Sequence, residues 1–369
     1  MKITEIRVYR HTIEVAGGLY QMSISEVTAL DTTVVVVETD AGIVGYGESC
    51  PLGSAYQPQH ALGARAAIAE VAPAVIDLDP RDHRLVNQAM DTTLNGHGYA
   101  KSPLDVACWD IAAKAADQRL CDFLGGAHQD PIPSYYGIMP AEPSAAAAHA
   151  VELQAAGFGR LQVKTGGRPV SEDIAVMQAV AEVAGPAVKL LADANRGWTQ
   201  RDAMLFSGAC RDIPLALEQP CATFEENAAL AGRVNHPVFL DESADSVSSV
   251  MRAIDGGAAQ GFGMKLSRVG GISKMNTVIG MCAARSIPLT SDDTWGGDIT
   301  NAATVHVGAS IPEAIFEGTW IGEPYTATAY PMRSETITNR TGHIAVPDGP
   351  GLGVTPDLDA WGEPVAVYR

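Results

Sequence analysis

The feature that most constrains the fold is a pattern after residue 130, where short apolar runs end in a charged residue. The charged residues recur every 23 to 29 residues: Lys164, Asp193, Glu218, Asp241, Lys265, Asp292 and Glu317. One strand, one helix and two short loops take up about 25 residues, so the spacing predicts successive parallel strands joined by helices. With a first strand expected at 132–136, the pattern gives eight strands.

Eight such strands can close into a barrel or form an open doubly wound sheet. The charged residues favour the barrel, because the carboxyl ends of its strands form one ring on which side chains from different strands converge. A charge at the end of a buried parallel strand is otherwise costly. We therefore predict an α/β barrel over residues 129–320.

The region before residue 129 has a different pattern, with antiparallel strands followed by helices. Alternating or β-branched residues predict strands at 3–11, 31–38 and 43–48, and helical periodicity follows at 59–72 and 101–116. Gly125 and Gly126 end the helical run. These residues predict a separate α+β domain over residues 1–128.

Composition excludes several classes of protein. A net charge of −18 opposes binding to nucleic acid or to an anionic membrane, because both need clustered Lys and Arg. The 46% hydrophobic and 18% charged content excludes a disordered chain. No signal peptide, no apolar stretch of about 18 residues and no CxxC pair is evident, so we expect a cytoplasmic protein with a small-molecule or protein partner.

Three of the charged residues, Asp193, Glu218 and Asp241, end consecutive predicted strands. Three carboxylates brought close together repel one another, and one would stay protonated unless a cation held them. Ligands that are all oxygen select a hard ion, with Mg²⁺ favoured. Each carboxylate alone could instead cap a helix or pair with an Arg, but the three in succession favour a metal.

Lys164 lies one strand before the carboxylates and Lys265 one strand after them, which on a closed barrel places the two amines on opposite sides of the metal. A partly buried lysine near a divalent cation can be pushed toward its neutral form and act as a base. The metal would bind a substrate carboxylate and stabilise the enediolate formed when the neighbouring carbon loses its proton. One lysine would remove the proton and the other would deliver one to the opposite face.

In these motifs the sequence resembles the muconate-lactonizing-enzyme subgroup of the enolase superfamily. The matching segments are VK at 163–164, DAN at 193–195, EQP at 218–220, DES at 241–243, GMKLSRVGG around Lys265, DVACWD at 105–110 and LGG at 124–126. The resemblance covers nearly the whole chain and implies a modified (β/α)7β barrel with an α+β N-terminal capping domain. The cap would comprise residues 1–128, completed by residues 321–369.

The resemblance also implies one Mg²⁺ held by Asp193, Glu218 and Asp241, and a homo-oligomer. A lysine base with Mg²⁺ stabilising an enediolate is the established pattern of this superfamily. The sequence departs from the subgroup at Gln162, where a lysine is usual. Since residues two apart on a strand point the same way, Gln162 is expected to face the pocket with Lys164.

Within the subgroup, the segments KTGGRP, DANRGW, LEQPC and SDDTWGGD are most similar to the hydroxyproline betaine 2-epimerases. The resemblance implies that proline betaine and 4-hydroxyproline betaine are substrates. A quaternary ammonium favours aromatic faces and nearby negative charge. The predicted substrate-binding residues are Tyr56, in the loop 53–57, with Gln162, Asn195, Asp292, Asp293, Trp295 and Trp320.

Purely structural roles stay open for several of these residues. The aromatic side chains could simply pack between the barrel rim and the cap, and Asp292 and Asp293 could cap a helix instead of supplying a negative field.

Three other functions remain open beside the epimerase. A dehydratase acting on a hydroxylated cyclic amino acid such as 3-hydroxyproline would use the same first proton transfer. A dipeptide or N-acylamino-acid epimerase could use the same lysines. A non-catalytic betaine-binding protein is the third, but a binder of a cationic ligand gains nothing from two nearby lysines.

Overall fold

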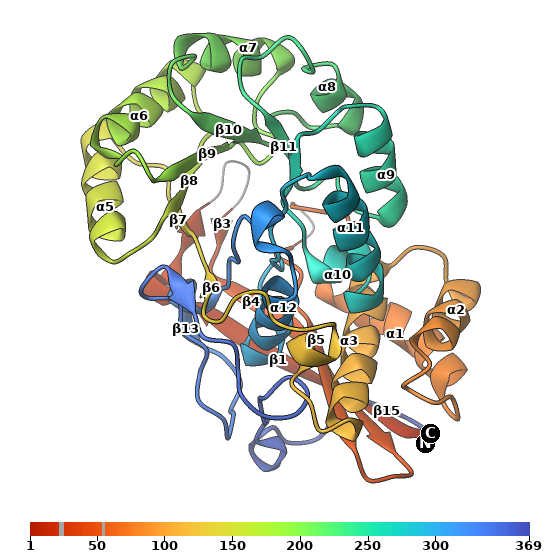
Figure 1. The fold of residues 1–369 in the computed structure, drawn as a ribbon. Helices are drawn as coiled ribbons and strands as arrows, with labels where there is room; N and C mark the ends of the chain where they lie inside the picture. Colours follow the sequence, from red (N-terminus) through yellow and green to blue (C-terminus); the bar gives the residue numbers. More distant parts are fainter. Residues whose placement is uncertain (22–25, 54–55) are drawn as a thin grey trace.

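The computed structural model describes residues 1–21, 26–53 and 56–369. Two residues of the predicted substrate loop, Ser54 and Ala55, lie outside the described residues. Figure 1 shows a ring of strands and helices formed by the middle of the chain, with the N-terminal sheet and its helices packed beside it. No helix in the described part of the chain is long and apolar enough to cross a membrane.

The N-terminal sheet is antiparallel and centres on two long strands, β1 (Ile3–Val15) and β4 (Ala29–Thr39), with β5 (Val44–Ser49) beside β4. Val34 to Val37 of β4 are fully buried, which explains the unbroken β-branched run in the sequence. A short hairpin joins β1 to β4, formed by β2 (Tyr20–Gln21) and β3 (Glu26–Val27). The three strands predicted here are confirmed.

Helices α1 (Ala61–Val75), α2 (His83–Thr93) and α3 (Gly98–Ala115) follow, and α4 (Leu120–Phe123) leads into the barrel. The predicted helices correspond to α1 and α3, whereas α2 was not predicted. Helix α3 packs closely on β5, where a Cβ at Gly47 would lie only 1.8 Å from the Pro103 carbonyl oxygen. Only glycine allows this approach.

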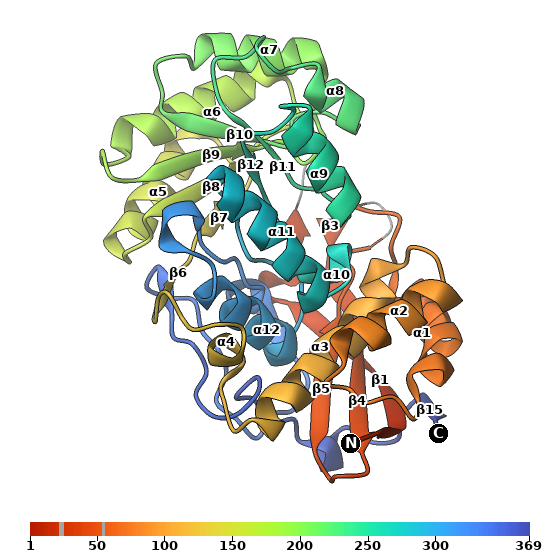
Figure 2. The same ribbon diagram turned by 45° about the vertical axis from the view of Figure 1, so that its right-hand side comes forward.

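The C-terminal segment returns to the N-terminal sheet. Strands β13 (Thr326–Thr328) and β15 (Ala366–Tyr368) both pair antiparallel with β1. The last strand of the chain therefore lies beside the first (Figure 2). Short 3-10 turns occupy the connections: Ala16–Gly18, Glu313–Ile315, Glu323–Tyr325 and Leu358–Ala360.

The barrel contains a continuous parallel sheet in the order β12-β11-β10-β9-β8-β7. Its strands are β7 (Tyr136–Ile138), β8 (Arg160–Lys164), β9 (Lys189–Asp193), β10 (Leu215–Glu218), β11 (Val238–Leu240) and β12 (Gly261–Phe262). Lys164 is paired in register with Asp193, and Asp193 with Glu218. These three predicted residues therefore end their strands at one level, whereas Asp241 and Lys265 follow the ends of β11 and β12.

Helices follow the barrel strands and lie around the barrel (Figure 1). They are α5 (Pro143–Ala155), α6 (Val170–Val183), α7 (Gln200–Ala209), α8 (Phe224–Ala228), α9 (Val247–Asp255), α10 (Leu266–Val269), α11 (Ile272–Arg285) and α12 (Asp298–Ala309). Side-chain caps begin α7, α8 and α9, where Thr199, Thr223 and Ser246 each accept a hydrogen bond from a backbone N–H of the first turn.

The barrel closes less regularly than predicted. The seventh and eighth segments make single parallel bridges, Phe262 with Leu289, Leu289 with Phe316 and Ser134 with Thr319. The predicted first strand at 132–136 is divided, because β6 (Ile132–Pro133) pairs antiparallel with β14 (His343–Ile344) and the barrel strand begins only at Tyr136. Pro133 has no N–H for a ladder, but its carbonyl accepts from the Thr319 N–H at 3.0 Å and helps to close the ring.

Candidate active site

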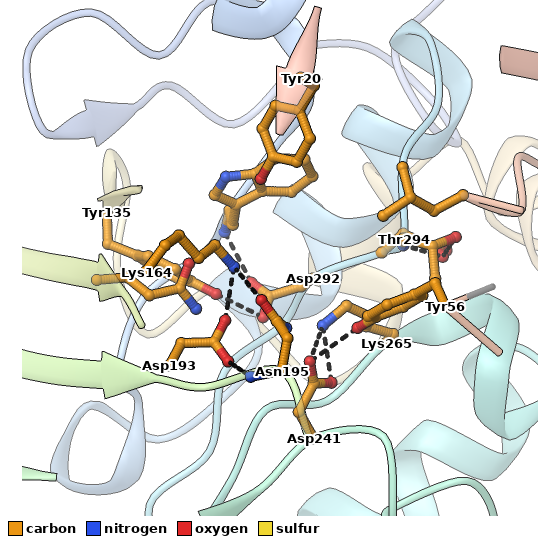
Figure 3. A pocket seen from close by; sticks show the side chains of 14 residues that line it. Tyr20, Tyr56, Tyr135, Lys164, Asp193, Asn195, Asp241, Lys265, Asp292 and Thr294 are labelled. Carbon is orange, nitrogen blue, oxygen red and sulfur yellow. Dashed lines mark hydrogen bonds and ion pairs between the residues drawn. The ribbon is translucent and has the colours of Figure 1, made fainter. Parts of the chain in front are cut away.

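A small cavity lies at the carboxyl ends of the barrel strands, covered by residues of the N-terminal domain (Figure 3). Its volume is about 40 Å³, measured as the space open to the centre of a water molecule. It is lined by Tyr20, Leu52, Tyr56, Tyr135, Gln162, Lys164, Asp193, Asn195, Asp241, Lys265, Asp292, Asp293, Thr294 and Trp320. The structure thus brings together ten of the twelve predicted site residues; Glu218 and Trp295 lie outside the lining.

Lys164 enters the cavity from the end of β8 and is 7% exposed. Its Nζ donates to Asp193 Oδ2 at 2.5 Å and to Asn195 Oδ1 at 3.2 Å. Asn195 also donates its backbone N–H to Asp193 Oδ1 at 2.9 Å, with a left-handed φ of 42°. Burial opposes the charge of Lys164, but the Asp193 carboxylate outweighs it and raises the lysine pKa.

Lys265 enters from the other side of the cavity (Figure 3). Its Nζ donates to both oxygens of Asp241, at 2.8 Å each. Asp241 also holds the guanidinium of Arg268, with Nη2 at 2.6 Å from Oδ1, and the Tyr56 hydroxyl, which donates to Oδ2 at 2.9 Å. Burial would raise the pKa of Asp241, but Arg268 and then Lys265 lower it.

The pKa of Lys265 is also raised, since Asp241 outweighs the opposing effect of burial. The prediction of a neutral lysine concerns a lysine beside a divalent cation, and it stays a prediction. With the side chains as they lie, neither lysine is pushed toward its neutral form. The physical reason is that each lysine lies directly on a carboxylate of the predicted metal site.

Glu218 does not line the cavity, but Gln162, which does, donates from Nε2 to its Oε2 at 2.6 Å. Burial, followed by the charges of Asp193 and Asp241, raises its pKa to about 8. Gly263 makes room for these carboxylates, because a Cβ at this position would lie 2.5 Å from Glu218 Oε1 and 3.4 Å from Asp241 Cγ. The repulsion expected from the sequence is therefore present.

This donor set fits a hard divalent cation, which would relieve the repulsion among buried carboxylates. The side chains are not arranged as ligands: among the described residues, no three His, Cys, Asp or Glu side chains converge on one point. The lysines and Arg268 draw Asp193 and Asp241 in different directions. Binding a metal would require these two carboxylates to turn away from their cationic partners.

A fourth carboxylate, Glu242, was not predicted. Its side chain is 4% exposed, and its Oε1 accepts from Asn195 Nδ2 at 3.2 Å. Burial, followed by Asp241 and Asp193, raises its pKa to about 8. The acidic pair Asp241–Glu242 in the sequence is the only local signal that could have indicated it.

Aromatic side chains form much of the cavity wall, but they are not all those predicted. Trp320 and Tyr56 line the cavity as expected. Trp295 is 1% exposed and packs behind Trp320, with ring centroids 5.6 Å apart, because its Nε1 donates to Thr326 Oγ1 at 3.1 Å. Tyr20 and Tyr135 also line the cavity and were not predicted. Tyr20 comes from the short hairpin between β1 and β4, far from the barrel strands in the sequence.

The two neighbouring aspartates have different surroundings. Asp293 accepts from the backbone N–H of Ser267 at 3.0 Å, in the first turn of α10, so it caps that helix from outside. Asp292 faces the cavity and accepts from Tyr135, Thr290 and the backbone N–H of Trp320. Of the two roles left open by the sequence, capping belongs to Asp293 alone.

The N-terminal domain fixes the loop that carries these aspartates. Glu48, buried at the end of β5, accepts from the backbone N–H groups of Gly297 and Thr300 at the start of α12, and from the Tyr330 hydroxyl. Thr294 Oγ1 donates to the Cys50 carbonyl at 2.8 Å. The loop 292–297 is thus anchored to the domain that covers the cavity.

Both parts of the chain match models of known protein families. Residues 4–125 match the family model "Mandelate racemase / muconate lactonizing enzyme, N-terminal domain", and residues 145–360 match "Enolase C-terminal domain-like". A cis-3-hydroxy-L-proline dehydratase from Roseibium aggregatum is 40% identical over 100% of both chains. A hydrophobic dipeptide epimerase from Enterococcus faecalis is 29% identical over 78% of this chain and 81% of its own.

A crystal structure is also closely similar. It is a member of the enolase superfamily from Roseovarius nubinhibens complexed with magnesium, with a TM-score of 0.94 and 35% sequence identity, and the match covers 100% of this chain and 99% of that one.

Proposed function

Because the chain belongs to the mandelate racemase/muconate lactonizing enzyme family of the enolase superfamily, we propose that it is a Mg²⁺-dependent epimerase that inverts C2 of proline betaine and 4-hydroxyproline betaine. The observation that carries this proposal is the pair of lysines, Lys164 and Lys265, which line one small cavity from different strand ends. A substrate carbon between them could exchange a proton with either amine.

In the proposed reaction, one lysine begins as the neutral amine and the other as the ammonium. The neutral amine takes the C2 proton, and the electron pair of the broken C–H bond spreads into the substrate carboxylate. The ammonium then gives its proton to the opposite face of C2, which forms the new C–H bond and inverts the centre. The two lysines end with their protonation states exchanged, and the reverse reaction starts from that state.

Asp193, Glu218 and Asp241 would hold Mg²⁺, which when bound supplies positive charge for the substrate carboxylate and takes up negative charge that otherwise keeps both lysines protonated. Burial alone would disfavour the charged forms of both lysines, an effect that Asp193 and Asp241 outweigh with the side chains as they lie. Gln162 donates a hydrogen bond to the Glu218 carboxylate and would orient it, without adding the positive charge that a lysine at position 162 would bring.

The cavity wall supports a compact substrate with a fixed positive charge. Trp320, Tyr20, Tyr56 and Tyr135 supply aromatic surface around buried carboxylates, the surroundings that a quaternary ammonium favours. A cavity of about 40 Å³ suits a single ring better than a dipeptide.

A second candidate is dehydration of cis-3-hydroxyproline, favoured by the 40% identity to the dehydratase of that name over the full chain. One lysine would again take the C2 proton. The other would protonate the departing C3 hydroxyl, so that water and an unsaturated ring leave the site. The two candidates share their first step and differ in the bond that breaks second.

Proton NMR in D₂O with Mg²⁺ tests these candidates with proline, proline betaine, 4-hydroxyproline betaine and cis-3-hydroxyproline. We expect deuterium to enter C2 of both epimers of a betaine. A pyrroline product from cis-3-hydroxyproline, without exchange in the betaines, would show that the protein is a dehydratase and not an epimerase. Tight betaine binding with no exchange at C2, together with no pyrroline product from cis-3-hydroxyproline, would contradict both enzymes.

A further inference from the structure

The Asp292 carboxylate faces the cavity with its acceptor positions largely filled by the protein. Its Oδ2 accepts from the Tyr135 hydroxyl at 2.8 Å and from Thr290 Oγ1 at 2.5 Å. Its Oδ1 accepts from the backbone N–H of Trp320 at 2.7 Å. A carboxylate offers about four acceptor positions, so three of the four on Asp292 are already used.

Tyr135 is held firmly in this arrangement. The side chain is 3% exposed, and the guanidinium carbon of Arg160 lies 4.3 Å from the centroid of its ring. Buried between Arg160 and Asp292, the ring is fixed so that its hydroxyl stays on Oδ2. The Trp320 backbone is bonded to the same carboxylate, so the negative charge and the aromatic face of the cavity form one unit.

The other carboxylates of the cavity wall are also engaged by protein donors. Asp193 accepts from Lys164, Asp241 from Lys265 and Tyr56, and Asp293 from the backbone N–H groups of Ser267 and Thr294. The cavity wall therefore contains four carboxylates, two of them paired with Lys164 and Lys265, but few vacant acceptors for an N–H group. The carboxylates attract any cationic ligand, whereas the lack of vacant acceptors disfavours only a cation that has N–H bonds.

We infer that Tyr135 is a positioning residue that sets substrate specificity: by occupying Asp292 it makes the site select a ring nitrogen without N–H bonds over the secondary ammonium of proline. A buried N–H without an acceptor costs binding energy, whereas a quaternary ammonium has none to satisfy and still gains from the charge and the Trp320 face. The inference rests on the proposed function and names the feature of the substrate that this site selects.

The test compares proline betaine, N-methylproline and proline, which carry none, one and two N–H bonds in their cationic forms. Calorimetric titration of the Mg²⁺-loaded wild type should give affinities that fall in that order, by about tenfold for each N–H. In Tyr135→Phe, a freed position on Oδ2 can accept an N–H from proline. We expect the betaine-to-proline ratio of kcat/KM to fall about tenfold, mainly through a lower KM for proline.

Two further variants separate this effect from structural damage. Tyr136→Phe is the matched control, since Tyr136 is the next residue and contacts Tyr325 rather than Asp292, and it should leave the ratio unchanged. Thr290→Val frees the same oxygen by another route and should shift the ratio in the same direction, so it decides the question if Tyr135→Phe does not fold. General damage to the site would instead lower kcat for both substrates alike.

The inference is overturned if wild type binds proline as tightly as its betaine, or if the folded variants at 135 and 290 keep the wild-type ratio within twofold. Failure of the proposed function looks different: deuterium would not enter C2 of the betaine in wild type. The binding order of the three ligands would still test the selection against N–H bonds in that case.

Discussion

Both sides of the cavity pair a lysine with an aspartate, but they hold the lysine differently. Lys164 contacts one oxygen of Asp193 and the amide of Asn195, both from the strand end next to its own. Lys265 shares both oxygens of Asp241 with a fully buried Arg268 and with Tyr56 from the covering domain. The two lysines could thus perform similar chemistry on the two faces of a substrate although Lys164 has few contacts and Lys265 belongs to a cluster of charged groups.

Replacing either lysine gives the largest expected effect. Lys164→Ala and Lys265→Ala should each lower C2 inversion by more than about 10³-fold, because a proton can no longer reach one face. Each variant should still exchange deuterium into one enantiomer, and into opposite enantiomers in the two variants. NMR of the separate enantiomers in D₂O measures this, with the exposed Lys189→Ala as control. Full inversion in either variant would show that two bases are not needed.

In the metal-free protein, removing the aspartate from each side should cost different amounts of stability. Asp241→Asn leaves Arg268 buried without its carboxylate, and because arginine does not lose its proton, we expect a loss of about 3–5 kcal/mol in the free energy of unfolding. Asp193→Asn leaves only Lys164, which can become neutral, so the loss should be about 1–2 kcal/mol. Urea unfolding in EDTA measures both. Equal losses would mean that the two sides are restrained alike.

Magnesium should act on both sides together, since the proposed ion joins Asp193, Glu218 and Asp241. At a concentration a hundredfold above its Kd, Mg²⁺ should raise the free energy of unfolding of wild type by about 2.7 kcal/mol. Glu218→Gln should abolish this gain. Glu242→Gln, which replaces a buried carboxylate whose pKa is likewise raised to about 8, should retain most of it. Thermal unfolding with and without Mg²⁺ checks the result, and equal shifts in both variants would contradict the predicted ligand set.

The smallest effect is expected at Asn195. Asn195→Ala removes the amide from Lys164 and should slow exchange on that lysine's face by about tenfold, leaving the other face within twofold of wild type. Because Asn195 has a φ of 42°, Asn195→Gly serves as the control that tolerates this backbone but also lacks the amide. Similar rates for the two variants would assign the loss to the amide. Slowing of both faces alike would argue against a local restraint on Lys164.

Much of the site could be read from the sequence because the residues that form it share one local rule. Lys164, Asp193, Glu218 and Asp241 end strands or follow them directly, and parallel strands bring these ends to one level. The long strands β1 and β4 could also be predicted, from alternating apolar residues and from runs of β-branched residues. The first barrel strand was misplaced because the apolar pair Ile132–Pro133 belongs to a different sheet, whose partner lies in the C-terminal segment.

By itself, the sequence determined the barrel, the domain beside it and the set of acids and lysines at the strand ends, since each follows from periodicity and spacing along the chain. Only the tertiary structure decided which carboxylate holds which cation, that Trp295 lies behind Trp320, and that Tyr20 and Tyr135 complete the cavity wall. These contacts join residues far apart in the chain, such as Tyr135 with Asp292 and Tyr56 with Asp241. Local periodicity carries no record of such pairs, because they form only when separate elements pack together.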